Sequence, residues 1–264
     1  MQIFLTGASG QIGSEFRKLL TVRNLPVILL SRKSLSLLKN ETFRKYELGD
    51  VLEDLVGVPE KILVHLAHDY SDRDATEKNI NVTGMRRLLE VGFDRIIFVS
   101  TPVLKRENLT VYQRQKQLLE KNLVSANALI IKPSFIYSAK GGANSILNFL
   151  KKLKIPVIIP PNTNKLSPIK VEDFAKFLIA NTIDTFDKKI ILVKGQNAMN
   201  FKQFLENYHK IRTFYIHIVF FNIILFFLKS VKIGPTFYLK ERMEGICNID
   251  DIDDLSTTYE TEIL

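Results

Sequence analysis

Short apolar runs, rich in leucine and β-branched residues, alternate with amphipathic stretches through the first half of the chain. An apolar run of this length without polar alternation predicts a strand buried on both faces. The runs predict strands at 3–6, 27–31, 45–48, 62–67, 95–100 and 128–133, and the amphipathic stretches predict helices near 11–21, 76–91 and 111–124. This alternation indicates an α/β fold with a doubly wound parallel sheet, the Rossmann fold, covered by helices on both faces.

The pattern changes after Pro133. We expect a helix near 144–153, a strand and a helix within 167–182, a strand at 188–195 and a helix that begins after an Asn200 cap. The sequence therefore predicts a main domain of residues 1–140. Residues 141–264 would form a smaller C-terminal subdomain packed on it, from which 168–195 return to the sheet.

Composition sets few limits on function. The chain has 264 residues, of which 46% are hydrophobic and 25% charged, as in ordinary soluble globular proteins. A single cysteine, Cys247, cannot form an internal disulfide and favours a reducing, cytosolic setting, and the first residues lack the pattern of a signal peptide. Lysine-rich solvated faces explain most of the net charge of +9, which also suits an anionic cofactor and substrate or an anionic membrane surface. No recognised nucleic-acid motif accompanies it, so we expect no nucleic-acid partner.

The segment "TGASGQIG" follows the first predicted strand and opens the first predicted helix. Its glycines, Gly7, Gly10 and Gly13, form a close variant of the dinucleotide-binding fingerprint. Gly7 permits a tight turn, Gly10 lets backbone amides approach a pyrophosphate, and Gly13 allows the helix to pack closely on the strand. The positive end of the helix dipole then faces the phosphates. This placement predicts a dinucleotide-binding loop.

The end of the second predicted strand bears on the choice of dinucleotide. A carboxylate there would bind ribose hydroxyls and favour NAD, but the strand ends with Arg32 and Lys33. A guanidinium suits a 2′-phosphate, so NADP is slightly favoured over NAD, although two exposed basic residues at a strand end remain the alternative. Asp50, after the third predicted strand, is a candidate acceptor for the adenine amino group.

Tyr112 and Lys116 lie four residues apart on a predicted helix, which places them on one face. The spacing alone occurs by chance in many chains, so its meaning depends on the surrounding motifs. Around it, in order, come "TGASGQIG" (6–13), "VHLAH" (64–68), "NVTG" (81–84), "IIFVST" (96–101), "YQRQK" (112–116), "LIIKPSFIYS" (129–138) and "SPIKVEDFAK" (167–176). This series resembles the extended short-chain dehydrogenase/reductases, specifically the NAD(P)-dependent epimerase/dehydratase branch, which acts largely on nucleotide sugars, as in polysaccharide biosynthesis. The resemblance runs from residue 2 to about 210.

The resemblance implies an enzyme in which Tyr112 exchanges a proton with a substrate hydroxyl while hydride moves between the same carbon and the nicotinamide. Lys116 would lower the pKa of the phenol, ordinarily about 10, and hold the nicotinamide ribose. Thr101, with Ser100 as second choice, would supply a hydroxyl donor. Asn81 is as well explained by a structural hydrogen bond as by a functional one. The implied cofactor-binding residues are Gly7, Ser9, Gly10, Gln11, Ile12, Arg32, Asp50, Val51, Leu66, Ala67, His68, Lys116 and Pro133, with Ser134 and Phe135 at the substrate.

Two departures leave the substrate open. His68 replaces a small residue that the family often has at this position. Neither His68 nor His65 is accompanied by a cluster of Cys or carboxylate residues that could complete a metal site, so no metal is expected. Only ten residues separate Thr101 from Tyr112, without the Tyr-Gly pair of the relatives, so the sugar pocket is differently walled. We expect an epimerase or dehydratase of a nucleotide sugar. The alternatives are an NADP-dependent reductase of a keto sugar, a reductase of an apolar carbonyl compound, and a non-catalytic assembly subunit that binds the dinucleotide.

The apolar run 214–228 is too short for an ordinary membrane-spanning helix. Three interpretations stay open: a buried or lid helix, an interfacial helix that contacts a membrane peripherally, and a contact surface in a homodimer. From Glu241 onward the chain has eight acidic residues and one basic residue. This end resembles the segment that closes over the substrate in these enzymes, but as a charge run it favours a solvated tail.

Overall fold

A computed structural model describes residues 1–52, 57, 60–103, 109–138, 152, 157–159, 164–184, 189–217, 219–220, 223 and 251–264. Its main element is an eight-stranded sheet in the order β3-β2-β1-β4-β5-β6-β11-β14, in which all pairs are parallel. The strands are β1 (Gln2–Thr6), β2 (Val27–Ser31), β3 (Glu41–Lys45), β4 (Lys61–His65), β5 (Arg95–Val99), β6 (Ala128–Pro133), β11 (Ile190–Lys194) and β14 (Thr261–Ile263). The predicted doubly wound parallel sheet is confirmed.

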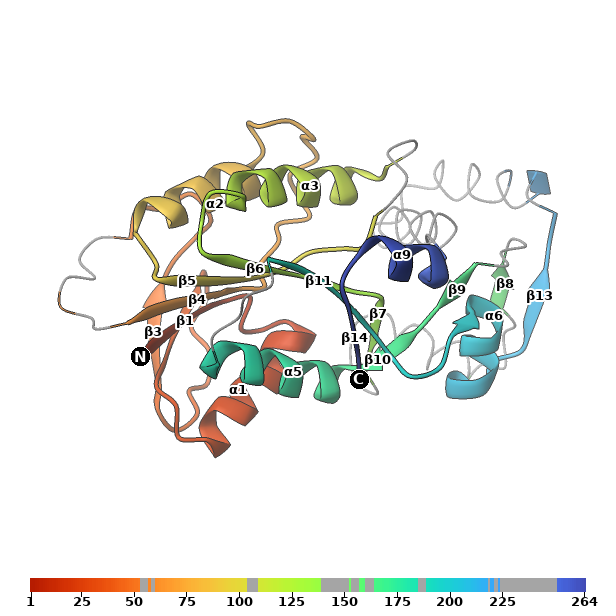
Figure 1. The fold of residues 1–264 in the computed structure, drawn as a ribbon, viewed down its shortest axis with the longest axis horizontal. Coiled ribbons are helices and arrows are strands. Elements are labelled where there is room, and N and C mark those ends of the chain that lie inside the picture. The colour runs from red at the N-terminus through yellow and green to blue at the C-terminus, as the bar shows by residue number, and fades with distance from the viewer. Residues whose placement is uncertain are drawn as a thin grey trace.

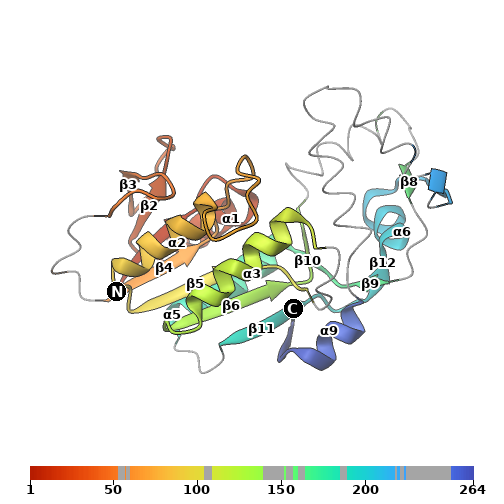
Figure 2. The ribbon, with the colours of Figure 1, turned by 90° about the horizontal axis from the view of Figure 1, so that it is seen from above.

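Helices cover both faces of this sheet (Figures 1 and 2). On one face lie α1 (Gln11–Val22) and α5 (Val171–Ile183), and on the other lie α2 (Ile80–Glu90) and α3 (Val111–Leu123). Because neighbouring strand residues point to opposite faces, Ile3 and Leu5 belong to the core under α1 and α5, whereas Phe4 belongs to the core under α2 and α3. Two apolar cores on either side explain why the strands contain apolar runs without alternation.

Those described residues beyond β6 that do not return to the main sheet form a smaller layer at its carboxyl end (Figure 1). It contains three two-stranded sheets: β7 (Phe135–Tyr137) with β10 (Pro168–Lys170), β9 (Lys165–Leu166) with β12 (Met199–Asn200), and β8 (Val157–Ile159) with β13 (Thr213–Tyr215). The helix predicted after the Asn200 cap is confirmed as α6 (Phe201–Phe204), which continues into a π-helical turn, η1 (Leu205–His209). The division at residue 140 remains a prediction, and the helix predicted near 144–153 lies outside the described residues except for residue 152.

The third strand was predicted at the wrong place. It spans Glu41–Lys45, four residues before the predicted 45–48, and its burial pattern is mixed. As the edge of the sheet it needs only one apolar face, so it lacks the continuous apolar run of the inner strands. Its position is fixed instead by Arg17 on α1, whose guanidinium donates to both Glu41 carboxylate oxygens at 2.7 and 2.6 Å.

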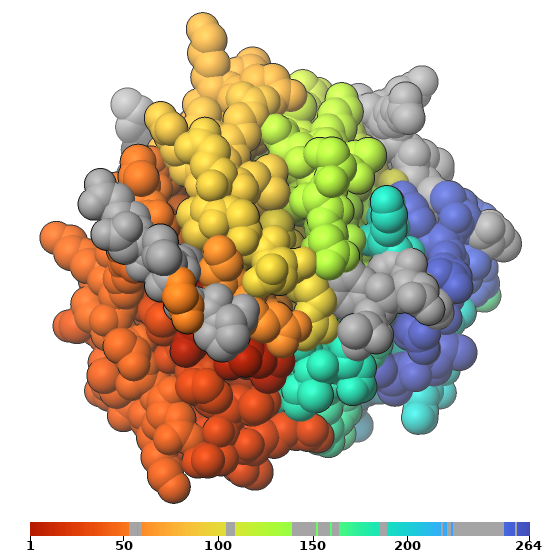
Figure 3. Space-filling model, turned by 60° about the vertical axis from the view of Figure 1, so that its left-hand side comes forward, coloured from red at the N-terminus to blue at the C-terminus, as the bar shows by residue number. Residues whose placement is uncertain are grey.

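The acidic end of the chain is not a solvated tail within its described residues, 251–264. It forms α9 (Ile252–Thr258), capped by Asp251, and then β14, which pairs with β11 at the second edge of the sheet. Ile252 and Leu255 pack with Leu192 in a small apolar cluster. Figure 3 shows this segment, in blue, at the surface beside blue-green residues of the α5–β11 region. Ile252 and Leu255 are three residues apart, a spacing typical of one face of a helix, but the aspartates around them led to the prediction of a solvated tail.

The apolar run 214–228 begins as a strand rather than a helix, because Phe214 and Tyr215 belong to β13. Both rings are exposed, as are Val219, Phe220 and Ile223. The other residues of the run, apart from Ile216 and His217, lie outside the described part, so the three interpretations of this run stay predictions. Among the helices of the described residues, none is long and apolar enough to cross a membrane.

The Arg17–Glu41 pair gives a stability prediction. The two side chains are 11% and 0% exposed, so Glu41→Gln leaves a buried guanidinium without its counter-charge. We expect the free energy of unfolding to fall by about 2–4 kcal/mol in urea or thermal unfolding. Glu15→Gln is the matched control, because Glu15 pairs with a largely exposed Lys18 and should change stability by less than about 0.5 kcal/mol. Equal effects of the two variants would contradict a special role for the buried pair.

Candidate active site

The glycine loop lies between β1 and α1, as predicted. Gly7 has a φ of 72°, and a Cβ there would lie 2.6 Å from the Leu66 carbonyl carbon. A Cβ on Gly13 would lie 2.3 Å from the Gly7 carbonyl oxygen. Any side chain at either position would push β1, α1 and the end of β4 apart, so only glycine fits at both.

The N-terminus of α1 is open to an anion. Gly10 is its N-cap, no side chain caps the first turn, and that turn contains no acidic residue. The helix dipole adds positive potential at this end of α1. The predicted residues Ser9, Gln11 and Ile12 lie in this turn or immediately before it. Together with the glycines, the arrangement fits the pyrophosphate of a dinucleotide.

Thr6 fastens the end of β4 to the glycine loop. Its hydroxyl oxygen accepts the backbone N–H groups of Leu66 and Ala67, each at 3.2 Å, and the hydroxyl bonds His65 Nδ1 at 2.9 Å. Since the oxygen already accepts twice, the hydroxyl proton is directed to a neutral imidazole. Burial, together with the nearby Lys116 charge, lowers the pKa of His65 to about 3. These contacts of His65 are internal to the fold and favour a structural role.

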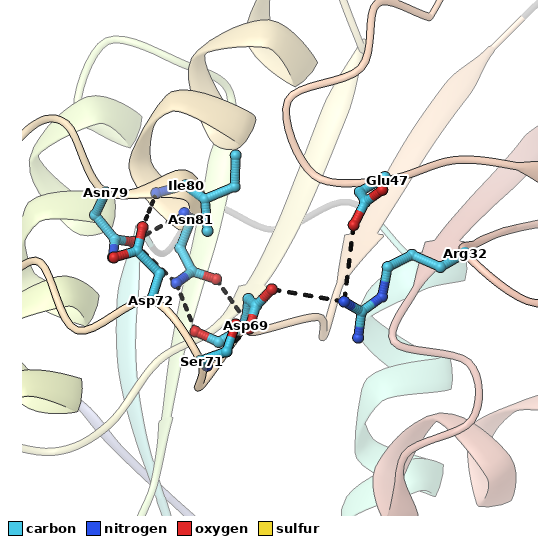
Figure 4. A network of polar contacts seen from close by, with 8 residues as sticks. All are labelled: Arg32, Glu47, Asp69, Ser71, Asp72, Asn79, Ile80 and Asn81. Atoms are coloured by element: carbon cyan, nitrogen blue, oxygen red, sulfur yellow. Dashed lines mark hydrogen bonds and ion pairs between the residues drawn. The ribbon is translucent and has the colours of Figure 1, made fainter.

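Asn81 holds the loop that follows β4 (Figure 4). Its side-chain oxygen accepts the Asp69 N–H at 2.7 Å, and its amide donates to the Asp69 carbonyl at 3.0 Å. Asn79 caps α2 and bonds the Asn81 side chain at 2.9 Å, and both asparagines are fully buried. Asn81 therefore fixes the backbone that carries Ala67, His68 and Asp69. These contacts favour a structural role for Asn81 over a functional one.

Arg32 extends from the end of β2 across to this loop (Figure 4). One of its guanidinium nitrogens lies 3.6 Å from Asp69 and 3.8 Å from Glu47, while its side chain is 63% exposed. Asp50, the candidate acceptor for the adenine amino group, and Val51, a further predicted cofactor-binding residue, are both exposed. One Asp50 carboxylate oxygen accepts the Glu47 N–H at 2.6 Å. Exposed ion pairs of this length contribute little, so Arg32 remains able to exchange its carboxylate partners for a ligand phosphate.

Tyr112 and Lys116 lie on one face of α3, where this helix begins near the carboxyl end of β5. Lys116 is 3% exposed, and its ammonium donates to the Val99 carbonyl at 2.8 Å. The nitrogen lies 5.7 Å from the centroid of the Tyr112 ring and 4.6 Å from that of Phe98. Burial lowers the pKa of Lys116 to about 7, and the Glu120 carboxylate opposes this decrease. The structure therefore brings together a tyrosine and a lysine whose proton is held weakly.

Two further aromatic rings enclose Tyr112. His68 contacts it edge-on, with ring centroids 4.8 Å apart, and Tyr70 stacks on it at 5.6 Å. Burial, followed by the Lys116 charge, lowers the pKa of His68 to about 2, so its imidazole is neutral. Tyr70 was not singled out from the sequence, because one exposed tyrosine in a polar loop carries no motif. His68 fills space beside Tyr112 that a small residue would leave open.

The hydroxyls that end β5 have different surroundings. Ser100 is buried and donates to Glu120 on α3, whereas Thr101 is partly exposed. Thr101 is thus the more exposed of the two residues, and its role as hydroxyl donor stays a prediction. Glu120 was missed, since a glutamate on a charged helix has no distinguishing signal.

The residues predicted beside the substrate lie where β6 ends. Pro133 is buried within β6, and the Ser134 hydroxyl accepts the Ser167 N–H at 3.0 Å. Phe135 packs against Phe204 with ring centroids 5.0 Å apart. These contacts are internal ones, and the substrate-binding role of Ser134 and Phe135 remains a prediction. Within the described ranges, no group of three or more His, Cys, Asp or Glu side chains is arranged to hold a metal ion.

Solved structures similar to this chain include nucleotide-sugar enzymes. UDP-glucose 4-epimerase from Thermus thermophilus, in complex with NAD, aligns over 82% of this chain and 86% of that one, with 18% identity and a TM-score of 0.62. The UDP-glucose 4-epimerase of Thermotoga maritima, solved with UDP-glucose, gives the same identity, coverage and TM-score. An NAD-dependent NDP-hexosamine 5,6-dehydratase of tunicamycin biosynthesis aligns over 82% of this chain and 85% of that one, with 14% identity and a TM-score of 0.63. At these identities the likeness establishes the fold.

A search of curated proteins finds no match. The model of the NAD dependent epimerase/dehydratase family matches residues 3–139, which include the glycine loop, Thr101, Tyr112 and Lys116. That segment covers more than half of the sequence and contains the strand–loop–helix arrangement described above. The chain therefore belongs to the NAD-dependent epimerase/dehydratase family, a family of enzymes of the extended short-chain dehydrogenase/reductase type.

Proposed function

We propose that the protein is an NAD(P)-dependent epimerase or dehydratase that oxidises or reduces a carbinol carbon of a nucleotide sugar, with Tyr112 as the acid/base. The observation that carries this proposal is the pair formed by Tyr112 and the buried Lys116 at the carboxyl end of β5. A dinucleotide loop, a hydroxyl and a tyrosine–lysine pair at one end of a sheet are suited to hydride transfer coupled to proton transfer.

The residues have separate tasks in the proposed reaction. A bound NAD(P) supplies the hydride acceptor or donor. Thr101 holds the reacting oxygen of the substrate by a hydrogen bond, and Tyr112 as phenolate removes the proton from that oxygen during oxidation. In the reverse direction Tyr112 returns this proton. The charged form of Lys116 stabilises the phenolate, and the loss of its proton near neutral pH would remove that stabilisation.

Similar structures support a nucleotide sugar as substrate, since the Thermotoga maritima epimerase was solved with UDP-glucose. The His68 and Tyr70 rings beside Tyr112 would wall the reacting end of the sugar. A homodimer and a peripheral membrane contact through 214–228 remain predictions.

The second candidate function is an NADP-dependent reductase of a keto sugar, and Arg32 is the observation that favours it. Its weak, exposed ion pairs leave a guanidinium at the end of β2, where a 2′-phosphate would lie. Two of the similar solved structures named above instead carry NAD or are described as NAD-dependent, the Thermus thermophilus epimerase and the dehydratase. A slight preference for NADP is therefore our own proposal. A non-catalytic role is disfavoured, because it would not require Thr101, Tyr112 and Lys116 together.

Turnover tests the proposed roles. The protein is incubated with NAD⁺ or NADPH and a panel of UDP- and dTDP-linked hexoses, and products are separated by chromatography. We expect conversion of at least one sugar, and Tyr112→Phe should lower kcat by about 100-fold or more because the ring packing remains while the proton carrier is lost. Tyr215→Phe, on the exposed β13, is the matched control. Failure to convert any sugar in the panel would contradict the proposed function.

The two hydroxyls at the end of β5 are separated by a pair of variants. Thr101→Ala should lower kcat by about 10-fold or more, and Thr101→Ser should restore most of it. Ser100→Ala should keep kcat within about 3-fold of wild type, because its hydroxyl is directed to Glu120 rather than to the substrate. The opposite order of effects would assign the catalytic hydroxyl to Ser100.

Titration with NADPH and NADH, followed by fluorescence, tests the role of Arg32. We expect Arg32→Ala to weaken NADPH binding by about 10-fold or more, because a charge-assisted hydrogen bond to the 2′-phosphate is lost. NADH binding should change by less than about 2-fold, and Arg23→Ala, at an exposed arginine that ends α1, serves as control. Equal loss of both dinucleotides, or a wild-type preference for NADH, would be inconsistent with a phosphate clamp.

A further inference from the structure

A buried ion pair lies directly behind the proposed catalytic residues. Glu120, one turn after Lys116 on α3, accepts the Ser100 hydroxyl with one carboxylate oxygen and the Lys132 ammonium with the other, at 2.8 Å. The Lys132 side chain is 4% exposed and that of Glu120 16%. This pair connects α3 to the ends of β5 and β6, the two strands that bear the proposed site. Burial makes it sensitive to the loss of any partner.

The C-terminal segment completes this cluster through Tyr259. The Tyr259 hydroxyl donates to the Val103 carbonyl at 3.0 Å, and it lies 3.4 Å from the Lys132 ammonium, which can donate to it. The same ammonium lies 4.8 Å from the centroid of the Tyr259 ring. Val103 is buried and comes two residues after Thr101. A residue far along the chain thereby binds the backbone that carries the proposed catalytic hydroxyl.

Both sides of Tyr259 are fixed. Before it, α9 packs through Ile252 and Leu255 on Leu192, and the Tyr259 N–H bonds the Leu255 carbonyl at 3.0 Å. After it, β14 runs parallel to β11, and the Leu192 N–H donates to the Glu260 carbonyl at 2.8 Å. Figures 1 and 2 show α9 beside the carboxyl end of the sheet. The ring is therefore presented from a rigid support rather than from a loose end.

We propose that Tyr259 is a positioning residue of the active site, which acts with Lys132 and Glu120 to hold residues 100–103 so that Ser100 faces inward and Thr101 faces the substrate. This inference rests on the proposed function. Tyr259 anchors the segment on the far side of Thr101, while Glu120 anchors it through Ser100 on the near side. With both anchors the Thr101 backbone has one orientation, which is the requirement for a hydroxyl that must meet the reacting oxygen.

Tyr259→Phe removes only the hydroxyl and keeps the ring above Lys132. With the sugar found in the turnover panel, kcat should fall by about 10-fold, since the hydroxyl of Thr101 loses its fixed orientation. KM for the sugar and Kd for NADH should change by less than about 2-fold, because neither ligand is bound by Tyr259. A merely structural brace would lower the unfolding temperature without separating kcat from KM in this way.

Backbone hydrogen exchange provides a readout that needs no turnover. In NADH-bound protein, the peptide that covers residues 96–103 should exchange faster in Tyr259→Phe than in wild type, by about 10-fold at its last amides. Peptides of α1 and β2 should not change. Tyr215→Phe is the matched control, and it should alter neither exchange nor kcat.

The outcomes separate the two proposals. If wild type converts a sugar but Tyr259→Phe keeps kcat within 2-fold, or if residues 96–103 exchange at the wild-type rate, the positioning role is wrong while the proposed function stands. If wild type converts no sugar, the proposed function fails. Faster exchange in Tyr259→Phe would then still establish that Tyr259 holds this segment, and unchanged exchange would overturn that as well.

Discussion

The arrangement of the site depends on a close approach of three backbone segments at the start of the sheet. The glycine loop, the first turn of α1 and the end of β4 meet where Gly7 and Gly13 leave no room for a side chain. Thr6 then fastens β4 to this point through two backbone amides. Because β4 leads directly to His68 and Asp69, the loop that walls Tyr112 is oriented by contacts made at the dinucleotide end. The proposed dinucleotide site and the proposed catalytic site therefore depend on the same fixed part of the backbone.

Buried charge is the second constraint. Lys116 and Lys132 are both almost fully buried on the side of the sheet covered by α3, and Glu120 is the nearby carboxylate that interacts with both. A buried ammonium without a counter-charge would be strongly destabilising. Because one carboxylate lies near both lysines, it offsets part of this loss of stability but not all of it. Lys116 keeps a weakly held proton as a result. Burial disfavours the charged form of Lys116, which costs stability. The same effect makes it easier for Lys116 to release its proton during a reaction.

The sequence was enough to predict the central sheet and the family, and to place the candidate site residues at one end of that sheet. Apolar runs mark strands that are buried on both faces, and the order of the motifs brings Thr101, Tyr112 and Lys116 to one end of the sheet. The edge strand β3 and the C-terminal α9–β14 segment were misplaced, because each is held by partners remote in sequence. Glu41 owes its position to Arg17, and Tyr259 owes its position to Val103 and Lys132. Such pairings follow from the assembled fold, and no local pattern signals them.

The position of β14 has a consequence for the solubility of the folded chain. Without it, β11 would end the sheet with the apolar run "IILV" and a row of unpaired backbone groups, the kind of edge on which strands of neighbouring molecules add and aggregate. With β14 present, the outer strand of the sheet is only three residues long and contains a glutamate. The opposite edge, β3, is likewise rich in charged side chains. Both borders of the sheet are therefore poor templates for edge-to-edge association, so an otherwise very apolar sheet is protected from pairing with other copies of itself.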